Sequence, residues 1–313
     1  MLWILLQLLG RRAATVQTLT EIRHLLAEAH LRPNKQFGQN FLVDRNLMGK
    51  VLDLADLTGT EHVLEVGPGT GSLTEELLAR AANVLAVEID HGLAAVLRER
   101  LGHRPGLRLM EADILCGKHA LSPEVLAALP GTVHVVANLP YNIATPLIAL
   151  CLCASHAARS GRSPQASTFQ RLTFTVQREV ADRLAAGPGS KTYGPLSVTV
   201  ALLGRITPGP VVPAAAFWPP PNVASRIVRI DFDPVAAADL TDTDVLRRLL
   251  VLAFSQRRKQ IGSVLRRKDA AWPADALAGA LQAAGIDRTA RPERVAPGQF
   301  RLAANALAET PPH

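Results

Sequence analysis

The sequence predicts a doubly wound α/β fold, in which helices cover both faces of a mostly parallel sheet, followed by a small all-helical C-terminal domain. From residue 62 onward, short apolar runs typical of strands alternate with helical patterns, and this alternation indicates a parallel sheet. A glycine-rich turn follows the first of these runs, as in open α/β sheets that bind ligands. After Asp233 the strand patterns stop, and only helical patterns and turns continue to Leu307.

The N-terminal residues precede this alternation. Residues 1–9 are nearly all apolar, but such a run is too short to span a bilayer, which takes about 20 residues. Two arginines follow the run, whereas a signal peptide carries its positive charge before it, so we expect a surface segment or a start codon assigned too early. A helix is predicted over residues 19–29, because Thr18 and Glu21 have capping-box spacing and the apolar residues share one face.

The alternating region predicts strands that are each followed by a helix. The apolar, β-branched runs that we expect to form strands are residues 62–66, 84–87, 107–110, 133–137 and 172–176. The segments that we expect to form helices are residues 73–81, 92–101, 145–152 and 179–185. Residues 196–203 and 227–232 alternate β-branched and polar residues, so they are expected to close the sheet as an antiparallel pair. Residues 154–168 are rich in Ser, Ala and Arg without an apolar period, which predicts a surface loop.

The composition narrows the class of protein. Of the 313 residues, 48% are hydrophobic and 19% are charged, which excludes wholesale disorder. The 34 Lys and Arg residues outnumber the 27 Asp and Glu residues, and the resulting charge of +7 favours a polyanionic partner. Three cysteines are too few for a disulfide framework, so we expect a reducing, cytoplasmic location. No spacing of His and Cys predicts a metal site.

The glycine-rich turn runs from Glu65 to Gly71 in the sequence EVGPGTG. Glycines let the backbone turn tightly there and approach a ligand that a Cβ would exclude. Ser72 takes the place of the third glycine in the dinucleotide fingerprint, which disfavours a nicotinamide-dependent dehydrogenase, and no Lys-Ser/Thr pair follows, which excludes a phosphate-binding P-loop. A purely structural turn is the alternative.

Polar side chains follow the next three predicted strands. Glu88 ends the second strand, and a carboxylate there is suited to accept both hydroxyls of a ribose. Asp113 follows the third strand, where it is placed to accept from an adenine amino group, and Asn138 closes the fourth. Because parallel strands end at one edge of a sheet, these side chains are expected to share a ligand site there. Each one alone is also explained as a capping or solvated residue.

The run Asn138-Leu-Pro140-Tyr141 predicts an acceptor site for an aryl amine. The lone pair of such an amine is delocalised into the ring, so the amine is a poor nucleophile. The Asn138 side-chain oxygen and the Pro140 carbonyl are placed to accept both amine hydrogens and favour a pyramidal nitrogen. Tyr141 is placed to stack on the base, a contact worth roughly 1–3 kcal/mol. A proline turn after a strand is the alternative.

This run resembles the N/D-P-P-Y-type motif of S-adenosylmethionine-dependent amino methyltransferases, in the NLPY form typical of ribosomal RNA adenine N6-dimethyltransferases. From about Lys35 onward the chain resembles the family that dimethylates two adjacent adenines near the 3′ end of small-subunit rRNA. The further stretches that match family patterns are FGQNFL at 37–42, QREVA at 177–181, YG at 193–194, FWPPPNV at 217–223 with Ser225, and FSQRRK at 254–259.

The resemblance implies a Rossmann-like, seven-stranded class I methyltransferase sheet with S-adenosylmethionine as methyl donor. The residues that it implies for donor binding are Asn40, Leu42, Gly67, Gly69, Gly71, Glu88, Asp113 and Asn138. The residues that it implies for catalysis are Asn138, Pro140, Tyr141 and Phe217, with Phe217 as a second aromatic plate over the flipped adenine. Taken alone, Phe217 is equally well explained as a core or linker aromatic.

The same resemblance implies 16S rRNA of the small ribosomal subunit as substrate, with a role in ribosome biogenesis. The sequence carries no signal for the oligomeric state, and a monomer is the default expectation. A large-subunit rRNA methyltransferase of the macrolide-resistance type and a non-catalytic RNA-binding assembly factor are the alternatives. The basic residues expected to contact RNA phosphates are Arg257, Arg258, Lys259, Arg266, Arg267 and Lys268, although a solvated basic helix face also explains them. The predicted domains are an N-terminal extension at 1–34, a methyltransferase domain at 35–233 and an RNA-contacting helical domain at 234–313.

Overall fold

A computed structural model describes residues 17–117, 119–163, 167–264 and 272–310. The chain divides into two compact units that interleave along the sequence. The first unit lies within residues 1–147, 169–178 and 207–229, and the second within residues 148–168, 179–206 and 230–313. The domain boundary expected near residue 233 stays an interpretation of the sequence.

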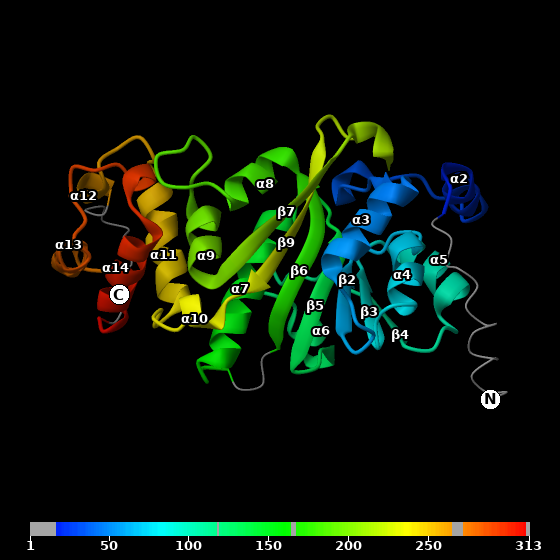
Figure 1. The fold of residues 1–313 in the computed structure, drawn as a ribbon, viewed down its shortest axis with the longest axis horizontal. Helices are drawn as coiled ribbons and strands as arrows, with labels where there is room; N and C mark the ends of the chain where they lie inside the picture. Colours follow the sequence, from blue (N-terminus) through cyan, green and yellow to red (C-terminus); the bar gives the residue numbers. More distant parts are fainter. Residues whose placement is uncertain (1–16, 118, 164–166, 265–271, 311–313) are drawn as a thin grey trace. The chain divides into compact units, whose positions relative to one another are not determined.

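A seven-stranded sheet has the order β4-β3-β2-β5-β6-β9-β7 (Figure 1). Its strands are β2 (His62–Val66), β3 (Asn83–Glu88), β4 (Leu107–Glu111), β5 (Thr132–Asn138), β6 (Thr168–Gln177), β7 (Gly204–Val212) and β9 (Ser225–Phe232). In the centre, Leu64 pairs in parallel with Leu85 on one side and Val135 on the other. The fold class expected from the sequence is therefore confirmed.

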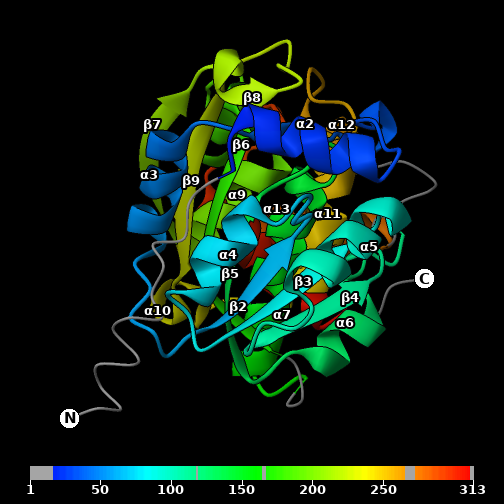
Figure 2. The same cartoon turned by 90° about the vertical axis from the view of Figure 1, so that its right-hand side faces the viewer.

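The strand order reverses at β2. The chain runs outward from β2 to β3 and β4 and then returns to β5 on the other side of β2. Helices α4 (Ser72–Leu78) and α5 (His91–Leu101) cover one face of these strands, and α6 (Pro123–Ala128) lies on the opposite face (Figure 2). Such a reversal opens a crevice at the carboxyl ends of the strands, where open α/β sheets bind ligands.

Among the described residues, two α-helices precede the sheet. Helix α2 (Leu19–Glu28) has the predicted capping box, in which the Thr18 hydroxyl accepts from the Glu21 amide and the Glu21 carboxylate accepts from the Thr18 amide. Helix α3 (Arg45–Ala55) begins at Asp44, whose carboxylate accepts from the Leu47 amide. The apolar face of α3 is buried in the core of the first unit.

A second, two-stranded sheet joins distant parts of the first unit. In it β1 (Phe41–Leu42) pairs antiparallel with β8 (Phe217–Trp218), with Phe41 opposite Trp218 and Leu42 opposite Phe217. The rings of Phe41 and Trp218 stack with their centroids 6.3 Å apart. This pairing holds the FGQNFL segment against the FWPPPNV segment.

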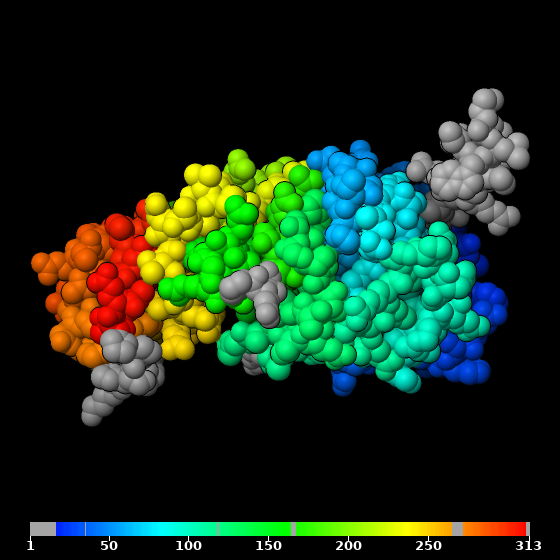
Figure 3. All heavy atoms as spheres, turned by 90° about the horizontal axis from the view of Figure 1, so that it is seen from below, coloured from blue at the N-terminus to red at the C-terminus, as the bar shows by residue number. Residues whose placement is uncertain are grey.

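The second unit is mainly helical. Helix α14 packs against α9, α11 and α13, and it lies beside α13 in both Figure 1 and Figure 3 (red beside orange). The Tyr193 hydroxyl donates to the Val295 carbonyl at 2.8 Å, and the rings of Tyr193, Phe254 and Phe300 form a chain of aromatic contacts. Its helices are α7 (Ala144–Arg159), which begins in the first unit, α8 (Arg178–Leu184), α9 (Pro195–Leu203), α10 (Pro234–Ala237), α11 (Thr243–Phe254), α12 (Ile261–Val264), α13 (Ala274–Ala283) and α14 (Pro297–Ala308).

Two expectations about these elements are wrong. Residues 196–203 form most of α9 rather than a strand, and β7 supplies the seventh strand instead. Pro195 occupies the first turn of α9, and the helix is buried nearly all round, so no polar face reveals its period. Residues 154–159 belong to α7 rather than to a loop. The Ser155 hydroxyl donates to the carbonyl of Cys151 one turn earlier, so a polar residue fits inside the helix.

The described residues contain no helix that combines the length and the apolar character needed to cross a membrane. The three cysteines are free thiols. Residues 1–16, on which the expectation of a surface segment rests, lie outside the described residues.

Candidate active site

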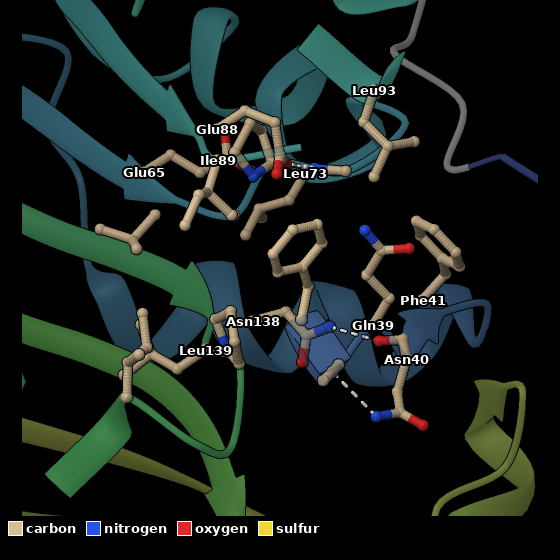
Figure 4. Close-up of a pocket in the computed structure, with 18 of the residues that line it drawn as sticks. Gln39, Asn40, Phe41, Glu65, Leu73, Glu88, Ile89, Leu93, Asn138 and Leu139 are labelled. Atoms are coloured by element: carbon tan, nitrogen blue, oxygen red, sulfur yellow. Dashed lines mark hydrogen bonds between the residues drawn. The ribbon is translucent and has the colours of Figure 1, made fainter. Parts of the chain in front are cut away.

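A cavity of about 310 Å³ lies at the carboxyl ends of the central strands (Figure 4). Its size is at the lower end of the range for small-molecule sites. Every residue that lines it belongs to the first unit. The segments that line it are Ile22 of α2, residues 36–42, Met48 and Val51 of α3, 65–70, 72–73, 87–89, Leu93, 112–114 and 138–143.

The glycine turn forms one wall of the cavity. Gly67 and Gly69 have φ angles of 68° and 61°, in the left-handed region that other residues rarely adopt. A Cβ at Gly69 would lie 2.9 Å from Cε1 of Phe41, and one at Gly67 would lie 3.2 Å from Cγ of Pro140. The turn therefore requires glycine both for its conformation and for the space beside it.

Gly71 has a different task from the other two predicted glycines. It caps the start of α4 with a φ of 86° and does not line the cavity. A Cβ there would lie 2.8 Å from Cδ1 of Leu101, so this glycine permits α4 to begin against α5.

Glu88 lies at the end of β3 with both carboxylate oxygens engaged by backbone amides. Oε2 accepts from the Gly69 amide at 3.0 Å, and Oε1 accepts from the Asp90 amide at 2.9 Å. Burial raises the pKa of this carboxyl, while these two hydrogen bonds act in the opposite direction. Each carboxylate oxygen keeps further lone-pair capacity for a ligand in the cavity.

Glu65 is a second buried acid in the cavity wall, and no motif in the sequence points to it. It is 1% exposed, and its Oε2 has no hydrogen-bond partner among the described residues. Burial raises the pKa of this carboxyl to about 8. The signal that could have identified it is an acid inside an otherwise apolar strand, HVLEV.

The Asn138 amide is held from two sides. Its Nδ2 donates to the Asn40 backbone carbonyl at 2.8 Å (Figure 4), and its Oδ1 accepts from the Thr175 hydroxyl. The side chain of Asn40 in turn donates to the Gly38 carbonyl at 3.0 Å. These contacts link the predicted donor-binding segment at residue 40 directly to the predicted catalytic motif.

The rest of the NLPY run also lines the cavity. The Pro140 carbonyl accepts from the Ile143 amide at 3.2 Å, which leaves its second lone pair available. The Tyr141 hydroxyl and the buried Ser225 hydroxyl are 2.8 Å apart, and burial raises the pKa of the tyrosine. The tyrosine ring is therefore fixed at its far end.

Two more predicted donor residues lie in this wall. Asp113 is exposed at the cavity and accepts from the Leu115 amide at 2.9 Å. Leu42 is buried and lines the cavity from β1. Phe217, by contrast, is 3% exposed, packs in the core with Leu42 and Met48, and does not line the cavity. Of the residues predicted for donor binding and catalysis, all line the cavity except Gly71 and Phe217.

Gln17 is a contact of the glycine turn that no sequence pattern revealed. Its Nε2 donates to the Thr70 carbonyl at 3.1 Å, and its Oε1 accepts from the Thr70 hydroxyl at 2.6 Å. Its backbone amide donates to the Ser72 hydroxyl at 3.0 Å. Since Ile22 of α2 lines the cavity, the segment placed outside the methyltransferase domain by sequence reasoning contributes to its wall.

The predicted RNA-binding residues belong to the second unit and differ in their surroundings. Arg257 donates through Nε to the Glu293 carboxylate at 2.7 Å and through a terminal nitrogen to the Ser190 carbonyl at 2.9 Å. Arg258 and Lys259 are exposed. Arg266, Arg267 and Lys268 lie outside the described residues. Arg258 and Lys259 are therefore exposed to solvent, whereas Arg257 is engaged in contacts with Glu293 and Ser190.

Among the described residues, no group of three or more His, Cys, Asp or Glu side chains is arranged to hold a metal ion. The cavity offers carboxylate and amide oxygens, backbone groups and one aromatic hydroxyl. This set suits a nucleoside with an amino group, because hydroxyl and amine hydrogens both need acceptors.

Comparison with known proteins agrees with this arrangement. The family model for ribosomal RNA adenine dimethylases matches residues 30–309. The chain is 40% identical over 271 residues to the ribosomal RNA small subunit methyltransferase A of Synechococcus sp. (strain WH7803), covering 85% of this chain and 90% of that protein. It is 39% identical over 287 residues to the protein of the same name from Magnetococcus marinus, covering 91% and 95%.

Solved structures give the same picture. The chain is similar to the 23S rRNA methyltransferase ErmE, with a TM-score of 0.57 and 27% identity over 86% of this chain and 100% of that one. It shares the fold of a dimethyladenosine transferase from Plasmodium falciparum, with a TM-score of 0.64 and 22% identity over 85% and 96% of the two chains. The expected family is confirmed by the family model, which matches residues 30–309, and by curated relatives of 39–40% identity: the chain belongs to the ribosomal RNA adenine dimethylase family.

Proposed function

We propose that this protein transfers methyl groups from S-adenosylmethionine to N6 of two adjacent adenines in the 3′-terminal hairpin loop of 16S rRNA, in the small ribosomal subunit. The observation that carries the proposal is the Asn138 amide, held at the edge of a nucleoside-sized cavity with a defined acceptor oxygen. The curated relatives named ribosomal RNA small subunit methyltransferase A support the choice of small-subunit rRNA.

The cavity fits the methyl donor. The glycine turn lines the cavity with backbone in a conformation that glycine favours at Gly67 and Gly69, so a ligand can approach this backbone closely. The Glu88 carboxylate is placed to accept from ribose hydroxyls, and Asp113 to accept from the adenine amino group. When bound, S-adenosylmethionine supplies an electrophilic methyl carbon attached to a positively charged sulfur.

The chain's own residues prepare the acceptor amine. Asn138 Oδ1 and the Pro140 carbonyl hold the two N6 hydrogens, which draws the nitrogen lone pair out of conjugation with the ring. Tyr141, fixed through Ser225, stacks on the base, and such a contact is worth roughly 1–3 kcal/mol. Positioning and these fixed dipoles carry the chemistry, and the amine proton passes to solvent.

The second unit supplies a surface for the RNA backbone. Arg258 and Lys259 are exposed on the segment that the Arg257–Glu293 ion pair holds in place. Exposed cations of this kind neutralise phosphates and make binding depend on salt. An adenine in a loop is already unpaired, so turning it into the cavity costs at most a few kcal/mol. We place the protein in the cytoplasm as a monomer, in keeping with a ribosome-biogenesis role.

The proposal is tested with labelled S-adenosylmethionine and small subunits that lack the modification. The wild-type protein is expected to label two neighbouring adenines near the 3′ end of 16S rRNA, and Asn138→Ala to reduce this labelling at least 100-fold. Large subunits serve as the competing substrate, because ErmE is named as a 23S rRNA methyltransferase. Labelling of 23S rRNA in place of 16S rRNA would show that the proposed substrate is wrong.

A further inference from the structure

Thr175 is a fully buried residue of β6 whose hydroxyl donates to Oδ1 of Asn138. Strand β6 lies beside β5 in the sheet, and Asn138 is the last residue of β5. Thr175 does not line the cavity, so it acts on a ligand only through Asn138. Neither the sequence patterns nor the family resemblance assigned it a role.

The contact matters because an Asn side chain rotates easily about its last torsion, whose energy wells are broad. The Asn40 carbonyl can only accept a hydrogen bond, so it fixes which side of the Asn138 amide carries the nitrogen. The amide is planar, so the Nδ2 contact limits how far the oxygen can turn, but one hydrogen bond still permits some rotation about the last torsion. The Thr175 hydroxyl removes this freedom and occupies one of the two lone pairs of Oδ1, leaving the other for the substrate amine.

We propose that Thr175 is a positioning residue for methyl transfer, which aims the free lone pair of Asn138 Oδ1 at the acceptor amine. This inference rests on the proposed function and adds a residue to its acceptor site. Misplacement of a reacting group by about 1 Å costs on the order of 100-fold in rate. Because the Asn40 contact remains in its absence, we expect loss of the Thr175 hydroxyl to lower kcat by about tenfold.

The chain provides a matched control on the same strand. Thr173 lies two residues earlier, so its side chain points to the same face of the sheet as that of Thr175. It is also fully buried, but its hydroxyl has no hydrogen-bond partner among the described residues. Thr175→Val and Thr173→Val therefore make the same buried exchange of a hydroxyl for a methyl, and only the first removes a contact to Asn138.

Steady-state methylation with both variants is the kinetic test. We expect Thr175→Val to lower kcat about tenfold while the donor affinity, measured by calorimetry, stays at the wild-type value. Thr173→Val is expected to keep the wild-type kcat, and Thr175→Ser, which restores the hydroxyl, to recover most of it. A wild-type kcat in Thr175→Val would overturn the proposal. Equal losses in both valine variants, or a parallel loss of donor affinity, would assign Thr175 a structural role only.

A second measurement needs no RNA and separates this inference from the choice of substrate. The side-chain amide signal of Asn138 is assigned in the 15N-labelled protein by its loss in Asn138→Ala. We expect Thr175→Val to shift and broaden this signal, because the amide gains rotational freedom, and Thr173→Val to leave it unchanged. An unchanged Asn138 signal in Thr175→Val would refute the positioning role whichever RNA the enzyme methylates.

Discussion

The tie between Gln17 and the glycine turn leads to a quantitative prediction. Gln17→Ala removes both side-chain hydrogen bonds to Thr70 but keeps the backbone bond to Ser72. Thr70 is 2% exposed, so its hydroxyl loses an acceptor that water does not replace. The Thr70 carbonyl keeps its bond from Arg100. The change therefore acts on one loop at the cavity wall.

The expected magnitude follows from these contacts. Two hydrogen bonds at about 1 kcal/mol each, and a buried hydroxyl left unpaired at about 1 kcal/mol, give a loss of about 2–3 kcal/mol in the free energy of unfolding. Because the turn that meets the donor becomes less fixed, we expect donor affinity to fall about threefold to tenfold, which corresponds to about 0.7–1.4 kcal/mol.

Urea unfolding and calorimetric titration with S-adenosylmethionine measure the two effects of Gln17→Ala. Thr18→Ala is the control, because it removes the cap of α2, at a cost of about 1 kcal/mol, without touching the turn. We expect the control to lower stability and to leave donor affinity within twofold of the wild type. The reasoning is refuted if both variants lower donor affinity equally, or if Gln17→Ala leaves it unchanged.

Three further predictions concern the cavity and the basic segment. The pKa of Glu65 is about 8 in the folded protein, whereas the unfolded chain releases this proton near pH 4.5. The folded state therefore binds one more proton in this range, so the free energy of unfolding decreases as the pH rises from about 4.5 to about 8. Glu65→Gln should remove this part of the pH dependence, by up to a few kcal/mol, in urea titrations at several pH values. Gly69→Ala should cost about 1–2 kcal/mol from its positive φ, together with a contact to Phe41, and calorimetry should show donor binding weakened by at least tenfold. The double variant Arg258→Ala, Lys259→Ala should reduce the slope of log affinity for RNA against log salt by about 1–2, with donor affinity unchanged.

Much of the fold was predictable because its signals are local. His62–Val66 is a short, largely apolar run before a turn, and Ser225–Phe232 alternates buried apolar and less buried polar residues. The capping box of α2 is visible as Thr18 and Glu21. Helix α9 was not predictable, because a helix buried nearly all round shows no polar face and its Val and Thr residues are also typical of strands. A helical period is visible only when one face is apolar and another is polar, and the faces of α9 do not differ in this way.

Residues of the candidate site were predictable where one residue type suits the chemistry at a strand end, as at Glu88 and Asn138. The residues that hold those groups were not, because their partners come from other parts of the chain. Thr175 is an ordinary strand residue until β6 lies beside β5, and Gln17 is an ordinary polar residue until it reaches Thr70. Phe217 shows the opposite case: the resemblance implies that it stacks on the acceptor base, but in this structure it is packed in the core.

The pairing of β1 with β8 has a consequence for the time at which activity arises during synthesis. Phe41 is among the early residues of the domain, yet its strand partner, Trp218, leaves the ribosome only after most of the sheet has been made. Contacts between such distant positions carry a large loop-closure entropy and form late in folding. A nascent chain that ends before Trp218 can form the Asn40–Asn138 contact but lacks the strand partner of Phe41 and Leu42. We therefore expect methyl-donor binding to mature fully only as the last strands of the first unit emerge.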